Sequence, residues 1–282
     1  MGCKEKTDID LSRIEITNQS DIDFYCDHLS DNPTYDGTIF IDASEELDYK
    51  CLSSIKHING ELILHGPGSS KAFKDLESIV GNQVFSICDE LVDTICFPNL
   101  KIVDNGQGIS INSSCNFSNV LYLPEIEKLT SLTISSPFTD EERSGTLLGF
   151  NKIIEIIALR LDNGNQGNNF KIDGFENLER VVSTFNIMTS NEEFQVSESS
   201  FNSLEVANEF QIFQSSESNF QFSLEYLIPN LRVCESLNLF NVQPKELCYL
   251  KERIELGDIN ANVLNTITNQ FYGNEGVIEL CD

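Results

Sequence analysis

The 282-residue sequence has no tryptophan, two methionines and three histidines, and its 18 Lys+Arg stand against 45 Asp+Glu, a formal net charge of 18 − 45 = −27. This shortage of basic residues leaves no strip that could neutralise phosphates, so we expect no nucleic-acid partner and no direct binding to an anionic membrane surface. No stretch approaches the ~18 consecutive apolar residues that a membrane-spanning helix needs. Partners should therefore be neutral or cationic.

The sequence also lacks the residue patterns of two kinds of site, a Ser-His-Asp catalytic triad and a cysteine-based metal or redox site. The histidines are His28, His57 and His65, and no G-x-S-x-G motif accompanies them, which disfavours a Ser-His-Asp hydrolase. No two cysteines have the C-x-x-C spacing of a zinc knuckle or a redox motif. We therefore expect neither a metal nor a cofactor.

The chain is nevertheless apolar enough to fold. Hydrophobic residues make up 40% of it and aromatic residues 9%. An acidic disordered chain contains fewer. We expect a core that covers most of the length.

Nine cysteines gather toward the two ends of the chain, and none lies between residues 116 and 233. Without a metal motif, disulfides are their expected use, and we expect these to staple the ends. The favoured pairs are Cys3 with Cys26, and Cys248 with either Cys234 or Cys281, and the odd count leaves one cysteine over. The disulfide candidates are Cys3, Cys26, Cys88, Cys96, Cys234, Cys248 and Cys281.

Three N-x-[ST] sequons occur, at Asn18, Asn112 and Asn116. In a secretory compartment each could carry a glycan, although a chain rich in Asn and Ser contains some by chance. The sequons and the cysteines together predict an extracellular protein.

A short strand-like pattern, x-apolar-x-apolar, recurs along the chain. Its first apolar residues are Ile39, Leu62, Phe85, Ile109, Leu132, Leu159, Phe185, Phe210 and Leu237, so the spacings are 23, 23, 24, 23, 27, 26, 25 and 27 residues. This is the period of a solenoid, in which each turn buries its apolar side against the next. Alternate residues of each strand should point inward and stack as apolar ladders.

A second apolar row lies between these strands. Its copies have the form [FLI]-x-x-[LI] and include FPNL at 97, LPEI at 123 and IPNL at 228. The prolines and the shortness of each unit favour extended or irregular structure over helix. The segments before this row vary in length, so we expect loops there, with a charged insertion at 135–149 and a mobile turn at 161–174.

These patterns predict an all-β fold, a right-handed parallel β-solenoid like that of leucine-rich repeats, with about nine turns of 23–27 residues. One continuous domain should consist of an N-terminal cap at 1–36, the repeats at 37–258 and a C-terminal cap at 259–282, with disulfides stapling the caps.

The outward strand positions are the candidate binding face. They include Phe40, Ile63, Ser110, Thr133, Arg160, Asn186, Gln211 and Asn238. This face is either a solvated sheet or a flat recognition surface for a wall glycan or a partner protein. Phe40 and Ile63 form either an exposed patch or a contact beneath residues 3–36. The lack of outward aromatic residues farther along the face weakens the glycan alternative.

The same positions argue against an enzyme. Glycan-active solenoids place two carboxylates about 5 to 9 Å apart. The outward acids, Glu61 and Glu209, lie six turns apart at about 4.8 Å per turn, so they cannot act on one bond.

The FPNL and LPEI units, the x-L-x-I strands and the opening NQSDIDFYC…DGTIFID…LSSIKHINGELIL resemble the receptor L-domain superfamily over residues 3 to 281. Within it the sequence is most similar to fungal GPI-anchored surface glycoproteins of the extracellular-mutant and sporulation-specific kind. The resemblance implies a non-enzymatic ectodomain at the cell surface or cell wall that organises the wall or spore wall by binding or adhesion. Contact with a membrane would then occur only through a lipid anchor.

Other functions stay open. The chain could be a receptor-like or effector module that binds a cell-surface protein through the sheet face. Weaker alternatives are a polysaccharide-active β-solenoid enzyme and a bacterial lipoprotein acylated at Cys3.

Overall fold

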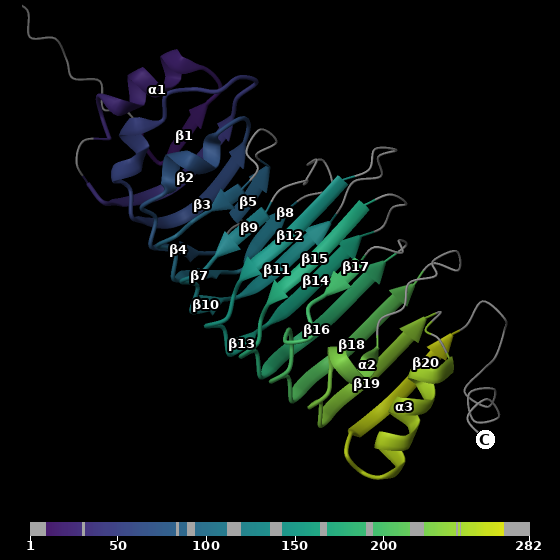
Figure 1. Ribbon diagram of the computed structural model, residues 1–282. Coiled ribbons are helices and arrows are strands. Elements are labelled where there is room, and N and C mark those ends of the chain that lie inside the picture. Colours follow the sequence, from purple (N-terminus) through teal and green to yellow (C-terminus); the bar gives the residue numbers. More distant parts are fainter. Residues whose placement is uncertain are drawn as a thin grey trace, which may run out of the picture.

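The structure is a computed structural model, and it describes residues 10–29, 32–82, 85–88, 94–111, 120–135, 143–163, 168–189, 194–214, 223–240, 242 and 244–267. The chain forms an elongated stack of turns that runs from α1 (Gln19–Cys26) at one end to α3 (Pro244–Glu255) at the other (Figure 1). Most elements are β-strands, as the repeat predicts, and the strand pairs are parallel in both sheets.

The x-apolar-x-apolar segments form one wide parallel sheet of 15 strands. The longer part of this sheet consists of β1 (Arg13–Ile16), β2 (Thr34–Asp42), β3 (His57–His65), β5 (Phe85–Cys88), β8 (Ile109–Ile111), β11 (Ser131–Ser135), β14 (Ala158–Asn163), β16 (Arg180–Thr189), β18 (Val206–Gln214), β19 (Val233–Phe240) and β20 (Asn260–Ile267). Four short strands precede β5, β8, β11 and β14 in their turns: β4 (Ser78–Gly81), β7 (Ile102–Asn105), β10 (Lys128–Leu129) and β13 (Glu155–Ile156).

The sheet extends into both segments that the sequence predicts as caps. β1 pairs with β2, with Ile14 opposite Ile39, and β20 pairs with β19, with Leu264 opposite Leu237. The sequence Arg13–Ile16 has the same x-apolar-x-apolar pattern as the nine copies, so the pattern itself accounts for the additional strand at the N-terminal end.

A second parallel sheet replaces the loops expected before the second apolar row. Its strands are β6 (Thr94–Cys96), β9 (Val120–Leu123), β12 (Arg143–Gly149), β15 (Asn168–Gly174) and β17 (Phe194–Val196). The expectation of a loop at 135–149 and of a mobile turn at 161–174 is therefore wrong where β12, β14 and β15 cross these segments, whereas residues 136–142 and 164–167 lie outside the described residues. Leu121 and Leu147, for example, are in-register neighbours in this sheet, and both are fully buried. The composition of these segments favours loops, but hydrogen bonding to the neighbouring turns makes them strands.

Buried rows of apolar side chains fill the space between the two sheets. Phe150, Phe175 and Phe201, from the second apolar row, are fully buried and stack from turn to turn, with ring centroids 4.6 and 5.5 Å apart. All three have positive φ values, of 66°, 69° and 61°. A left-handed backbone costs free energy for a residue other than glycine, so the packing of these rings offsets the strain.

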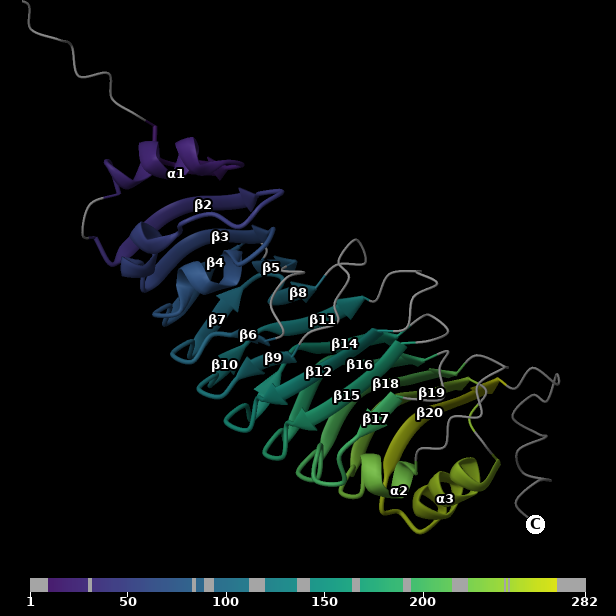
Figure 2. The same ribbon diagram turned by 45° about the horizontal axis from the view of Figure 1, so that its top comes forward.

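Helices close the two ends of the stack. The N-terminal end has α1 and the short 3₁₀ helix η1 (Lys50–Ser54), and η2 (Ser69–Phe73) follows in the next turn. The C-terminal end has α2 (Leu224–Leu227) and α3 beside β20 (Figure 2). The guanidinium of Arg253 on α3 donates to the carbonyls of Ile228 and Leu231 at 3.2 and 3.0 Å, which fixes this helix to the preceding turn.

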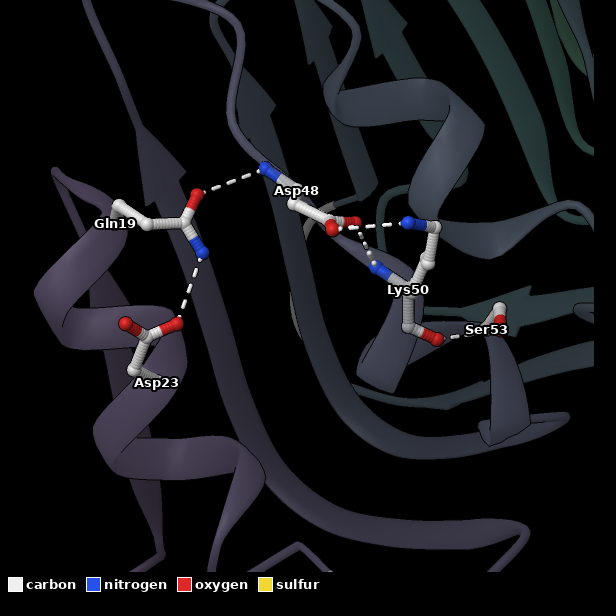
Figure 3. A network of polar contacts seen from close by, with 5 residues as sticks. All are labelled: Gln19, Asp23, Asp48, Lys50 and Ser53. Atoms are coloured by element: carbon white, nitrogen blue, oxygen red, sulfur yellow. Dashed lines mark hydrogen bonds and ion pairs between the residues drawn. The ribbon is translucent and has the colours of Figure 1, made fainter.

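A polar network joins α1 to the following turn (Figure 3). The side chain of Gln19 accepts a hydrogen bond from the Asp48 amide at 2.9 Å and donates to Asp23 at 3.0 Å. Asp48 also pairs with Lys50 at 3.0 Å. This ion pair is exposed to solvent and therefore contributes little to the free energy of folding. The main effect of the network is to position the turn beside α1.

A disulfide between Cys26 on α1 and Cys51 on η1 joins the same two turns. The predicted pairing of Cys3 with Cys26 is therefore wrong, and Cys51 was not among the candidates. The two cysteines are 25 residues apart, about one repeat, so they occupy neighbouring places in consecutive turns. That coincidence with the repeat period is the signal that identifies the pair.

The other described cysteines divide into two kinds. Cys88 and Cys248 are disulfide-bonded, whereas Cys96 and Cys234 are free thiols. The expectation of disulfides at Cys96 and Cys234, and with it the Cys234–Cys248 pairing, is therefore wrong; Cys3 and Cys281 lie outside the described residues. Burial raises the pKa of Cys96, and it raises that of Cys234 to about 11, so both stay protonated and unreactive near neutral pH.

Candidate functional site

The residues of the candidate binding face lie in one continuous row across the sheet, which we call the central row. In-register pairing joins each of them to its neighbour in the next turn, with Ser86 completing the row between Ile63 and Ser110. The central row consists of Phe40, Ile63, Ser86, Ser110, Thr133, Arg160, Asn186, Gln211 and Asn238. The apolar ladders on either side of it are buried, so the central row faces away from the core.

At the N-terminal end of the central row, Phe40 and Ile63 are half-buried. Phe40 lies in register with Glu15 of β1, and the Arg13 guanidinium lies 5.7 Å from its ring centroid. The described part of the N-terminal segment therefore continues the sheet beside Phe40. An Arg over an aromatic ring is a favourable contact, so this end of the row is partly occupied by the chain itself.

Asp42, His65 and Ser86 follow one another across three turns near the same end. A ring nitrogen of His65 lies 3.2 Å from the Ser86 hydroxyl, and Asp42 is in register with His65. Burial lowers the pKa of His65, and the Asp42 charge opposes that effect. Ser86 is only 8% exposed, so its hydroxyl offers a substrate no open approach.

Farther along the sheet, Glu209 is the centre of a polar network. Its carboxylate accepts hydrogen bonds from Thr184 at 3.2 Å, from Gln211 at 2.5 Å and from Asn238 at 3.4 Å. Asn238 also donates to Ser236 at 3.1 Å. These contacts hold the amide side chains of Gln211 and Asn238, on the neighbouring strands β18 and β19, in fixed orientations, which preorganises this part of the face.

A second outward row, which the sequence analysis missed, runs beside the amides. Met188, Phe213 and Phe240 are in-register neighbours two residues beyond Asn186, Gln211 and Asn238. We call these three residues the apolar ridge. The two phenylalanine rings stack with centroids 3.8 Å apart and planes 13° apart. The expected lack of outward aromatic residues is therefore wrong for this region, because the strands continue one alternation beyond the repeated four-residue pattern.

The central row and the apolar ridge together make a two-part surface. The amides offer hydrogen-bond donors and acceptors, and the ridge offers apolar contact, both repeating at the strand spacing of about 4.8 Å. Met188 is 36% exposed, and Phe213 and Phe240 are half-buried. Such a surface can bind an extended ligand that has polar groups along one side and an apolar face along the other.

The predicted glycosylation sites, and a search for metal-binding groups and membrane-spanning helices, add no further site. Asn18 is exposed and caps α1, accepting a hydrogen bond from the Asp21 amide at 3.2 Å, whereas Asn112 and Asn116 lie outside the described residues. Across the described ranges, no three His, Cys, Asp or Glu side chains are grouped as metal ligands. In that same part of the chain, no helix is both long and apolar enough to cross a membrane.

Comparisons of the chain with protein-family models, with curated proteins and with solved structures found no match. The assignment of function therefore depends on the geometry of the sheet face and on the resemblance seen in the sequence.

Proposed function

We propose that the protein is a non-enzymatic binding module of a cell surface, and that its outward sheet face holds a neutral glycan of a cell wall or spore wall. The observation that carries the proposal is the alignment of Asn186, Gln211 and Asn238 beside the apolar ridge. A sugar chain has hydroxyl groups along its edges and C–H groups on its faces. It therefore complements amides on one side and apolar side chains on the other.

The negative charge of the protein favours a neutral glycan over an anionic one. Glu209 lies within the amide network, and the whole chain carries a formal charge of −27. An anionic polysaccharide would be repelled, whereas a neutral glucan, mannan or chitin chain would not. Arg160, which is exposed on the central row, is the cation nearest to the amides along that row.

An extracellular location is the companion proposal. The disulfide between Cys26 and Cys51 and the disulfide-bonded state of Cys88 and Cys248 support an oxidising compartment. A wall-organising role and a lipid anchor follow from the resemblance to GPI-anchored surface glycoproteins. We further infer a right-handed coil of about nine repeats in 37–258, because connections between parallel strands are almost always right-handed.

Retention on insoluble polysaccharides tests the binding proposal. The purified chain is incubated with particulate β-glucan, chitin and mannan, and the bound fraction is measured. We expect saturable retention on at least one of them, and a loss of about tenfold in affinity for Phe213→Ala and for Gln211→Ala. Phe24→Ala is the control, because Phe24 is 49% exposed on α1 at the N-terminal end of the stack, whereas Gln211 and Phe213 lie on β18 (Figure 1).

Two results would contradict the proposal. Absence of retention on all three polysaccharides, together with a single protein captured from cell-surface extract in a Gln211-dependent way, would establish the receptor-like alternative instead. Release of new reducing ends during the incubation would show that the protein is an enzyme.

A further inference from the structure

Glu209 is a carboxylate on the outward sheet face whose described partners are all neutral. It is half-buried on β18, in register with Thr184 on β16 and Ser236 on β19. Its oxygens accept from the Thr184 hydroxyl and from the amide nitrogens of Gln211 and Asn238, and no Lys or Arg among the described residues pairs with it. A half-buried charge without a counter-ion depends on such donors, so we expect them to stay with the carboxylate.

The direction of these hydrogen bonds fixes how the two amides are turned. An ionised carboxylate can only accept, so each neighbour donates to it. Asn238 uses both N–H groups of its amide, one for Glu209 at 3.4 Å and one for the Ser236 hydroxyl at 3.1 Å. Gln211 donates through Nε2, and because the nitrogen and oxygen of a planar amide point in different directions, its carbonyl oxygen is turned away from Glu209. No described residue donates to that oxygen, so the network leaves it as an acceptor in a fixed orientation.

Glu61 provides a comparison within the same sheet. It accepts a hydrogen bond from the Thr38 hydroxyl of the preceding turn at 3.5 Å, the same kind of contact that Glu209 makes at 3.2 Å, and both glutamates are half-buried. Two residues farther along its strand, however, Glu61 is followed by Ile63 and not by an amide. The contacts to amide side chains are therefore what distinguishes Glu209.

We propose that Glu209 is a positioning residue of the glycan-binding face, which turns the amides of Gln211 and Asn238 and thereby makes this face select a ligand by its hydrogen-bond donors. The inference rests on the proposed function, because it concerns the same surface. A hydroxyl group of the glycan donates to the Gln211 carbonyl oxygen. A glycan whose donors are all methylated keeps its apolar surface but has no hydrogen to donate, so it binds poorly.

Calorimetric titration with hexasaccharides of β-glucan, chitin and mannan, each compared with its permethylated form, tests the proposal. We expect saturable binding of at least one native hexasaccharide and at least tenfold weaker binding of its permethylated form. In Glu209→Gln the native hexasaccharide should bind more weakly and this ratio should fall toward one, because the amide introduced there donates as well as accepts and no longer fixes its neighbours. Glu61→Gln is the matched control, since it removes the same charge next to a Thr hydroxyl, and it should keep the ratio of the parent chain.

The possible failures are distinguishable. If none of the native hexasaccharides binds, the proposed function fails and this inference fails with it. Equal binding of a native hexasaccharide and its permethylated form would leave glycan binding in place and overturn selection by donors. Methyl groups also add bulk, but a purely steric effect would give Glu209→Gln the same ratio as the parent chain. That result, or an equal fall of the ratio in Glu61→Gln, would overturn the role of Glu209.

The side-chain amide signals of Gln211 and Asn238 give a second readout that needs no ligand. In ¹⁵N-resolved spectra of the free chain, Glu209→Gln should shift these signals, because their N–H groups lose a charged acceptor. Glu61→Gln should leave them in place. Unchanged signals in Glu209→Gln would show that the carboxylate does not hold the two amides, and would overturn the proposal.

Discussion

Phe213 and Phe240 stack almost face to face on the outward side of the sheet, with ring centroids 3.8 Å apart. A similar stack between Phe150 and Phe175 lies in the core, where both rings are fully buried. The ring planes of both pairs are 13° apart, but the surroundings of the two pairs differ, so they should contribute differently to stability.

We expect Phe175→Ala to lower the free energy of unfolding by about 3–5 kcal/mol, because it leaves a cavity in a close-packed row. Phe240→Ala should cost about 1 kcal/mol, since it removes a half-buried ring and one aromatic pair. Urea unfolding followed by circular dichroism measures both. Equal losses would show that the apolar ridge is part of the core and not a surface kept for a ligand.

Two glycines with positive φ separate backbone strain from close packing. A Cβ on Gly108, where φ is 72°, would lie 1.9 Å from the Ser131 carbonyl oxygen, whereas one on Gly257, where φ is 80°, would meet nothing within 4 Å. Both alanine variants carry the cost of a left-handed backbone, about 1 kcal/mol.

We therefore expect Gly257→Ala to lower the melting temperature by a few degrees and Gly108→Ala to lower it much further or prevent folding. Thermal unfolding of the two variants side by side makes the comparison. If both lost the same stability, the turns would not approach as closely at Gly108 as the parallel register requires.

The Cys26–Cys51 disulfide closes a loop of 25 residues at the N-terminal end. The chain-entropy relation gives about 3.5 kcal/mol for a loop of this length. The double variant Cys26→Ser, Cys51→Ser should lose about that much stability in urea unfolding. Cys96→Ser is the control, because Cys96 is a free thiol. Mass spectrometry of Cys51→Ala should detect one new alkylatable thiol, at Cys26; detection of none would contradict this pairing.

His65 gives the stability a pH dependence of definite sign. Because burial lowers its pKa in the folded chain, the unfolded chain binds the proton at a higher pH. The stability associated with neutral His65 is complete above its unfolded pKa of about 6.5 and is lost as the pH falls from there through the lowered folded pKa.

We expect His65→Gln to lose less stability than the parent chain between pH 7 and pH 5, as measured by the urea midpoint at each pH. His28→Gln, at an exposed position, is the control. A parent and a His65→Gln chain with the same pH slope would show that His65 is not held neutral by its surroundings.

The fold could be predicted from the sequence because one physical signal repeats in every turn. The alternation at Ile39/Ile41 and its copies indicates strands with one buried side, and the constant spacing places them next to one another. The central row was predictable for the same reason, since an alternating strand fixes which residues face outward.

The second sheet and the apolar ridge could not be predicted, because they depend on contacts between turns. Segments such as Arg143–Gly149 have little strand character of their own and become strands through pairing with neighbours on both sides. The apolar ridge at Phe213 and Phe240 lies beyond the repeated four-residue motif, so the periodicity of the sequence does not reveal it.

Met188 provides the most direct test of glycan binding at the outward sheet face. The sequence contains only two methionines, Met1 and Met188, and Met188 is on the apolar ridge next to Phe213. With ¹³C-methyl methionine, the spectrum therefore contains one reporter at the face and one internal control. Titration with soluble oligosaccharides of β-glucan, chitin and mannan should shift the Met188 methyl signal saturably and leave that of Met1 in place. A Met188 signal that stays unchanged with all three would contradict glycan binding at this face.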